Sequence, residues 1–262
     1  MYSAKCHAVL TGIVVLVLFI QVNLFASEMD DRIESAARQS YVFKIYLTGD
    51  TVAIQSRDGV VTLTGTVSAE PYKLLARETV ASLPGVKSVD SRLVAIGEIP
   101  DRYKDAWLVT KVKSTLMFHR NLNATEIEVS AKDGAVTLRG GQAISSEQKN
   151  LATEYAKDVE GVVTVANEMT VLTPGMPSDE SRSRKPMDDA SITALVKVTL
   201  LYHRSTSALE AVVETKQGVV ELRGKAGSTA EKERASKLVN DVYDVKRVVN
   251  NMTVEETESS PN

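Results

Sequence analysis

The chain has 262 residues, of which 43% are hydrophobic and 25% charged, so its composition is that of a globular protein rather than a disordered one. Its formal net charge of −3 provides no basic footprint for nucleic acid, and we expect no nucleic-acid partner. The one cysteine, Cys6, lies near the N-terminus. If that end is removed, disulfides, thiolate catalysis and cysteine metal sites are excluded.

The N-terminal segment, residues 1–26, has the pattern of a secretory signal peptide. Lys5 is its only fixed charge, an apolar run follows over residues 9–25, and the small residue Ala26 ends it. Its removal would change the net charge to −4 and place the protein in the periplasm. An uncleaved inner-membrane anchor stays open, although two polar residues leave the run shorter than the roughly 18–20 apolar residues of a span.

One phrase of eight residues occurs three times, at offsets of 75 and then 84 residues: Asp58 to Gly65, Asp133 to Gly140, and Gln217 to Gly224. The surrounding apolar positions superimpose without gaps, which indicates three copies of one small domain. We place domain 1 at residues 29–97, domain 2 at 101–172 and domain 3 at 188–255. The Pro/Ser-rich stretch 173–187 is typical of a flexible linker, and residues 256–262 form an acidic tail. Because the second link is long, we expect domains 1 and 2 to form a fixed pair with domain 3 tethered.

Each domain begins with an amphipathic helix, which Leu108, Val112 and Leu116 mark in domain 2 by their spacing of four. The equivalent helices are expected from about residue 30 to 47 and from about 188 to 203. Two short strands follow, joined by a tight turn. A second helix comes next, with Pro71 in its first turn in domain 1 and Ser145 or Ser146 as its cap in domain 2. A last strand completes the domain.

The glycines of the repeated phrase have structural roles in this interpretation. Gly59, Gly134 and Gly218 supply the positive φ of the hairpin turns, and Gly65, Gly140 and Gly224 bend the backbone where the second strand closes. A right-handed crossover then makes the third strand parallel to the second. We therefore predict an α+β protein of three tandem α-β-β-α-β domains, each a mixed three-stranded sheet with two helices on one face. Such sheets leave strand edges open for partners.

The repeated domain resembles the BON domain of bacterial envelope proteins. The resemblance rests on the Asp-Gly-x-Val-x-Leu-x-Gly phrase, the preceding amphipathic helix, and the Gly-Val-x-x-Val segments at Gly85 and Gly161. Domain 3 departs from it, with Gln217 for Asp and Asp244 for Gly. With a secretory signal, the tandem domains look like the osmotically induced periplasmic group of that family. This resemblance implies a non-enzymatic module that interacts with phospholipid or the envelope and is linked to osmotic or envelope stress.

The residues offer little for catalysis. His119 and His203 occupy matching positions at predicted helix ends, where a basic side chain satisfies terminal carbonyls, and we interpret them as helix caps. Lys44 takes that position in domain 1. No glycine-rich phosphate loop opens a helix, and no His/Asp/Glu spacing indicates a metal. We expect neither enzymatic activity nor a cofactor or metal.

The three domains differ in the residues along one flank of the first helix. On the first helix of domain 2, an aromatic and basic stripe lies beside the core face: Lys104, Trp107, Lys111, Ser114 and Phe118. Rings and lysines in this arrangement suit the headgroup layer of an anionic phospholipid membrane. The alternative is that Trp107 packs against a neighbouring helix or domain. A second hypothesis for the whole protein is a chaperone-like or protein-interaction module that holds unfolded or envelope partners at open sheet edges. A third is an adaptor for cell-wall polymers.

Overall fold

The computed structural model describes residues 28–96, 104–122, 124, 127–140, 145–171, 185–206 and 209–254. The signal peptide, most of the linker from residue 173, and the acidic tail are predictions that lie outside the described residues. Within them, no helix is both long and apolar enough to cross a bilayer.

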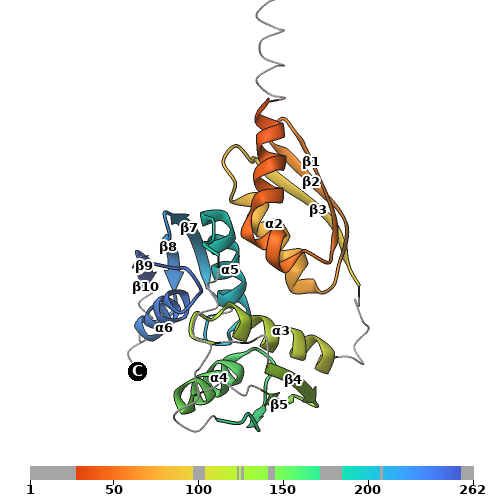
Figure 1. Ribbon diagram of the computed structural model, residues 1–262. Helices are drawn as coiled ribbons and strands as arrows, with labels where there is room; N and C mark the ends of the chain where they lie inside the picture. The colour runs from red at the N-terminus through yellow and green to blue at the C-terminus, as the bar shows by residue number, and fades with distance from the viewer. Residues whose placement is uncertain are drawn as a thin grey trace, which may run out of the picture.

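The three domains repeat one order of elements (Figure 1). Domain 1 has a helix over residues 28–39, a short π-helix η1 (Val42–Tyr46), β1 (Thr51–Arg57), β2 (Val60–Val67), α2 (Glu70–Ala81) and β3 (Ser88–Ala95). Domain 2 has α3 (Lys104–Phe118), β4 (Ile127–Lys132), β5 (Ala135–Gly140), α4 (Ser146–Asp158) and β6 (Thr164–Asn167). Domain 3 has α5 (Asp189–Tyr202), β7 (Glu210–Lys216), β8 (Val219–Ala226), α6 (Thr229–Asn240), β9 (Arg247–Asn250) and β10 (Thr253–Val254).

The sheets confirm the predicted fold class. In each domain the first two strands are antiparallel, and the strand after the second helix is parallel to the second strand. In domain 3 that last strand is interrupted, so that β9 and β10 both pair with β8. The second helices begin as expected, with a proline in the first turn of α2 and a capping box at Ser145 before α4.

The hairpin turns confirm the role predicted for Gly59, Gly134 and Gly218, whereas Gly65 and Gly224 have positive φ but lie within β2 and β8 and do not close them. Asp58 and Gly59 have φ of 52° and 80°, the left-handed pair of a type I′ turn, and the other two turns match them. An aspartate at the start of each first helix accepts hydrogen bonds from both turn amides: Asp30, Asp105 and Asp189. The first helix and the hairpin are therefore joined in the same way in all three domains. Hydrogen bonds from Ser56 and the turn amides lower the pKa of Asp30.

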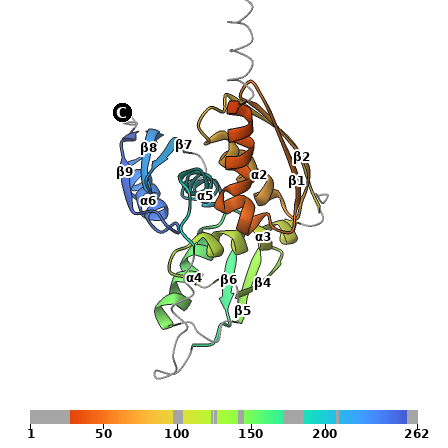
Figure 2. The same ribbon diagram turned by 45° about the horizontal axis from the view of Figure 1, so that its top comes forward.

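The packing between domains differs from the expected fixed pair of domains 1 and 2. The core residues of domains 1 and 3 form one continuous cluster, which also takes in Phe118 of domain 2. At its centre is α5, of which 11 of 14 residues are buried, and it lies between α2 and the sheet of domain 3 (Figure 2). Domain 2 has its own core, to which domain 3 contributes Leu238. Domain 3 thus connects the other two, and the prediction of a tethered domain 3 is wrong.

The physical reason lies in the composition of α5. Lys197 is its one basic residue and Asp189 its one acidic residue, so the helix is apolar on nearly every face and has to be covered on all sides. Lys197 reaches Glu78 of α2 with Nζ 2.8 Å from Oε2, and Glu78 also pairs with Arg77. Burial alone would raise the pKa of Glu78, but hydrogen bonds from Lys197 and Arg77 outweigh it and lower that pKa.

Candidate functional site: the Trp107 corner, the histidine contact and the β7 groove

In the structure, one end of the predicted lipid-facing stripe is exposed and the other end is buried. Trp107 remains 37% exposed near the start of α3, whereas Ser114 and Phe118 are 3% and 1% exposed. Phe118 packs edge-on against Tyr46 of domain 1, with 5.5 Å between ring centroids. Both buried residues belong to contacts within the protein, so they cannot face a membrane in this arrangement. Lys104 is the first residue of α3, and its side chain lies outside the description.

The exposed end of the stripe forms a small surface of Trp107 and Lys111, with the buried Tyr202 of α5 behind it, and we call these three residues the Trp107 corner. The Trp107 ring packs edge-on against Tyr202 of α5 at 6.0 Å, so the alternative of packing against a neighbouring domain is partly realised. The Lys111 ammonium lies 5.8 Å from the centroid of the Trp107 ring and donates to the carbonyl of Glu160 at 2.9 Å. Burial lowers the pKa of Lys111 and raises that of Tyr202.

Domains 2 and 3 meet in a reciprocal contact. His119, which follows α3, pairs with Val242 after α6, and His203, which follows α5, pairs with Val159 after α4. Arg120 N donates to the Asp241 carbonyl at 2.9 Å, and its equivalent Arg204 N donates to the Asp158 carbonyl at 2.7 Å. Both guanidinium groups donate to carbonyls of the opposite domain. The two halves are the same segments of the repeat used in both directions, as in a two-fold symmetric dimer.

The two histidine side chains lie inside this contact and do not cap their helices, although the backbone of His203 occupies the C-cap position of α5. His119 and His203 are 3% and 0% exposed. His203 Nδ1 lies 3.0 Å from a carboxylate oxygen of Asp158, across the domain boundary. His119 Nδ1 instead accepts from the amide of Asn121 at 3.0 Å, which leaves the proton of the neutral ring on Nε2. The helix-end position had suggested caps, but the side chains turn toward the other domain.

Tyr155 separates the two histidine rings, with ring centroids 4.4 Å from His119 and 5.5 Å from His203. Its hydroxyl donates to Asp241, and burial together with that carboxylate raises its pKa. Burial lowers the pKa of His119 to about 4. Burial would raise the pKa of Asp158, but hydrogen bonds from His203 and Ser205 lower it. These ionisable groups are engaged in joining the two domains.

A cavity of about 200 Å³ opens between α4 and α6 beside this contact. Its charged walls partly neutralise one another, since Lys237 lies 2.9 Å from Glu154 and Asp158 is held by His203. In the described part of the chain, no group of three or more His, Cys, Asp or Glu residues is arranged to hold a metal ion.

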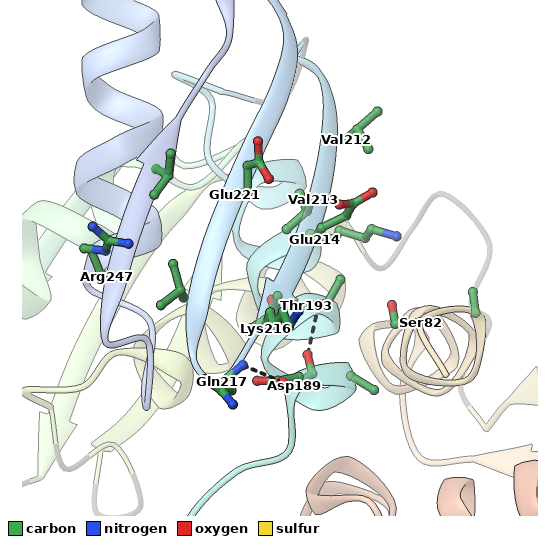
Figure 3. Close-up of a pocket in the computed structure, with 16 residues that line it drawn as sticks. Ser82, Asp189, Thr193, Val212, Val213, Glu214, Lys216, Gln217, Glu221 and Arg247 are labelled. Carbon is green, nitrogen blue, oxygen red and sulfur yellow. Dashed lines mark hydrogen bonds between the residues drawn. The ribbon is translucent and has the colours of Figure 1, made fainter. Parts of the chain in front are cut away.

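A larger groove, of about 840 Å³, runs from the C-terminal end of α2 past the outer edge of β7 and onto the face of the domain 3 sheet, where Glu221 of β8 and Arg247 of β9 line it (Figure 3). Ser82, the C-cap of α2, faces it from one side, and Val213 and Thr193 of domain 3 from the other. The sequence indicated open sheet edges in general but not this groove, because α2 comes to the edge of β7 only through the packing of α2 on α5.

A family model described as the BON domain matches residues 29–97, 104–173 and 188–256. The chain belongs to the BON domain family. The resemblance inferred from the repeated phrase is thereby confirmed, and it extends to the divergent domain 3.

Similar proteins come from bacteria. The chain is 32% identical over 166 residues to Osmotically-inducible protein Y of Escherichia coli, an alignment that spans 63% of this chain and 79% of that protein. It is 31% identical over 112 residues to the Outer membrane lipoprotein DolP of Haemophilus influenzae, covering 42% of this chain and 57% of DolP. The C-terminal domain of CdsD, a structural protein of the type III secretion system of Chlamydia trachomatis, is 16% identical to the chain. The match covers 85% of this chain and 95% of that chain, with a TM-score of 0.23. A TM-score that low carries no argument about function.

Proposed function

We propose that this BON protein is a non-enzymatic component of the periplasm that supports the cell envelope under osmotic stress by contacting anionic phospholipid surfaces through the Trp107 corner. Two relatives are named for osmotic induction and for the outer membrane, which supports the envelope setting. The observation that carries the lipid contact is the partly exposed Trp107 ring with the Lys111 ammonium beside it.

The chemistry of this corner suits a headgroup layer. An indole places an apolar ring and a polar N–H at a membrane interface, and a neighbouring lysine adds attraction to anionic lipid. The residue before Tyr202, Leu201, is 48% exposed and adds apolar surface at the end of α5. The positions equivalent to Trp107 are Arg32 in domain 1 and the buried Ser191 in domain 3, so the contact is assigned to domain 2. One aromatic anchor gives weak, reversible binding that salt diminishes.

Trp107 is the only tryptophan of the chain and therefore reports on its own surroundings. We expect its emission to shift to the blue when vesicles containing phosphatidylglycerol are added, and not with vesicles of phosphatidylcholine alone. Flotation of the protein with the same vesicles should fall with rising salt. Trp107→Ala should abolish flotation, and Lys111→Gln should weaken it several-fold.

A matched control moves the probe to another surface. The double variant Trp107→Phe, Val94→Trp carries its tryptophan on the outer face of the domain 1 sheet, where Val94 is 53% exposed. That tryptophan should not shift with any vesicle. Flotation unaffected by Trp107→Ala, or an equal shift at position 94, would remove the assignment. Cell fractionation and N-terminal sequencing test the periplasmic placement, because an uncleaved anchor would keep the protein in the inner membrane.

A further inference from the structure

The outer edge strands of domains 1 and 3 differ in whether side chains hydrogen-bond their outward main-chain groups. Because Arg57 and Val60 close the β1–β2 hairpin as a hydrogen-bonded pair, alternate residues of β1 direct their N–H and C=O outward. In domain 1, side chains of the first helix cover these groups. Ser56 N donates to Glu34 at 2.9 Å, and Arg38 donates to the carbonyl of Ile54 at 3.1 Å. The β1 edge is closed by side chains of its own domain.

Domain 3 lacks this cover. The residues equivalent to Glu34 and Arg38 are Thr193 and Lys197. The Thr193 side chain is too short to reach the edge amide. Its hydroxyl donates to the Asp189 carbonyl at 2.9 Å and lies 2.8 Å from the Thr215 hydroxyl. Lys197 turns away to Glu78 of domain 1. The arrangement that closes β1 is therefore absent at β7.

The β7 edge consequently presents a row of main-chain groups. With Lys216 and Val219 as the closing pair of the β7–β8 hairpin, the N–H and C=O of Ala211, Val213 and Thr215 point outward. Among the hydrogen bonds of the described residues, none occupies these groups. They alternate donor and acceptor along about 13 Å of strand, at the usual rise of about 3.3 Å per residue.

This edge faces the 840 Å³ groove, whose helix side is lined by the small side chains of Ala81, Ser82 and Ala190 together with Lys197, which pairs with Glu78. Small walls leave space for the side chains that an added strand would turn toward the helices. On the outer face of the sheet, its other side chains would lie beside Val212, Glu214 and Lys216, an apolar residue and both charge signs.

We propose that the β7 groove binds an extended segment of another, unfolded polypeptide, which adds to the domain 3 sheet as a strand beside β7. A row of alternating main-chain donors and acceptors is matched only by another extended backbone. The α2 wall limits the occupant to a single strand and leaves no room for the sheet edge of a second folded copy. The C-terminal end of the chain leaves the sheet from β10, on the far side of β8 from β7. The site goes beyond the lipid contact and shares no residue with the Trp107 corner.

Amide hydrogen exchange on the free protein tests the open edge. Ser56 N and Thr215 N occupy equivalent positions, and only Ser56 N has an acceptor, so Thr215 N should exchange much faster. Equal protection of the two amides would contradict the proposal. Thr215 N protected in proportion to protein concentration would show that a second copy occupies the edge, which would also overturn it.

Binding is measured with reduced, carboxymethylated lactalbumin, a permanently unfolded polypeptide, labelled with a fluorophore for anisotropy; native lactalbumin is the folded control. We expect saturable binding of the unfolded form alone, with new protection at the amides of Ala211, Val213 and Thr215. Thr193→Glu gives domain 3 a carboxylate at the position where Glu34 covers the β1 edge in domain 1. It should weaken binding at least tenfold. Because Thr193 is buried, the circular dichroism and Trp107 emission of the variant are checked first.

A second variant keeps the test valid if Thr193→Glu does not fold. Glu34→Ala with Arg38→Ala uncovers β1 on an exposed helix face and should create a second binding site for the unfolded probe. No binding by the wild-type chain, binding unchanged by Thr193→Glu, or protection that appears elsewhere than β7 would each overturn the proposal. Trp107→Ala should leave peptide binding unchanged, which separates this site from the lipid contact.

Discussion

Mild acid is expected to weaken the contact between domains 2 and 3 through His119. Burial is the largest cause that lowers the pKa of His119 from 6.5 to about 4. Neighbouring charges modify this effect: Asp241 raises the pKa, and Arg120, Lys237 and His203 lower it. Because the folded pKa is the lower one, the unfolded chain binds the proton first as the pH falls. Stability that is present above about pH 6.5 is therefore lost between there and pH 4.

The magnitude follows from the two pKa values. At 1.36 kcal/mol per pKa unit, lowering the pH from 7 to 5 removes about 2 kcal/mol from the free energy of unfolding. Asp158 does not interfere in this window, because its pKa is lowered from 3.8 and its effect appears at a lower pH. Urea unfolding followed by Trp107 emission measures the loss, since the Trp107 ring packs on Tyr202 of the other domain.

The comparison is made within each protein, between pH 7 and pH 5. In the wild type the free energy of unfolding should fall by about 2 kcal/mol more than in His119→Gln, whose side chain does not titrate. Any general destabilisation by the substitution is present at both pH values and cancels. A wild-type stability that is flat over this range, or an equal fall in the variant, would refute the assignment of a buried, neutral His119.

Three further substitutions test the packing. Tyr155→Phe deletes the hydroxyl that donates to Asp241 and should lower the free energy of unfolding by about 1–2 kcal/mol, measured by urea unfolding. Gly224→Ala should cost more than about 2 kcal/mol, because φ is +117° and the new Cβ would lie 2.0 Å from a carbonyl oxygen of β7; limited proteolysis should then cut domain 3 first. Glu78→Ala leaves Lys197 without its partner and should cost about 2 kcal/mol in thermal unfolding, whereas an unchanged midpoint would show that this bridge does not join domains 1 and 3.

The Trp107 stripe shows where sequence reasoning about the site ended. The spacing placed Trp107, Lys111, Ser114 and Phe118 on one flank of α3. Periodicity describes a single helix, and it does not say which part of a flank another domain covers. The structure buries the C-terminal half of the flank against domains 1 and 3 and leaves Trp107 partly exposed.

The prediction for the two histidines was limited in the same way, because it considered only one repeat at a time. A helix-end position favours capping, and nothing within one repeat indicates that the same segment of another repeat lies opposite. One signal was available in the sequence but unused. The segment of α5 has a single basic residue, Lys197, and is apolar on nearly all faces, which is typical of a helix buried between two layers. It would have predicted domain 3 at the centre of the protein.

The sequence by itself determined the repeated domain. The type I′ turns, the parallel third strand and the α+β class follow from Asp-Gly at the turn, alternating apolar residues and right-handed crossovers, which act over short separations in the chain. Only the tertiary structure decided how the three copies pack. The reciprocal histidine contact, the exposure of Trp107 and the open edge of β7 depend on side chains more than 40 residues apart along the chain, such as His203 with Asp158 and Lys197 with Glu78. Such pairings are selected by shape and charge complementarity between finished domains. The pattern within one domain can mark a buried helix such as α5, but it does not identify the side chains that cover it.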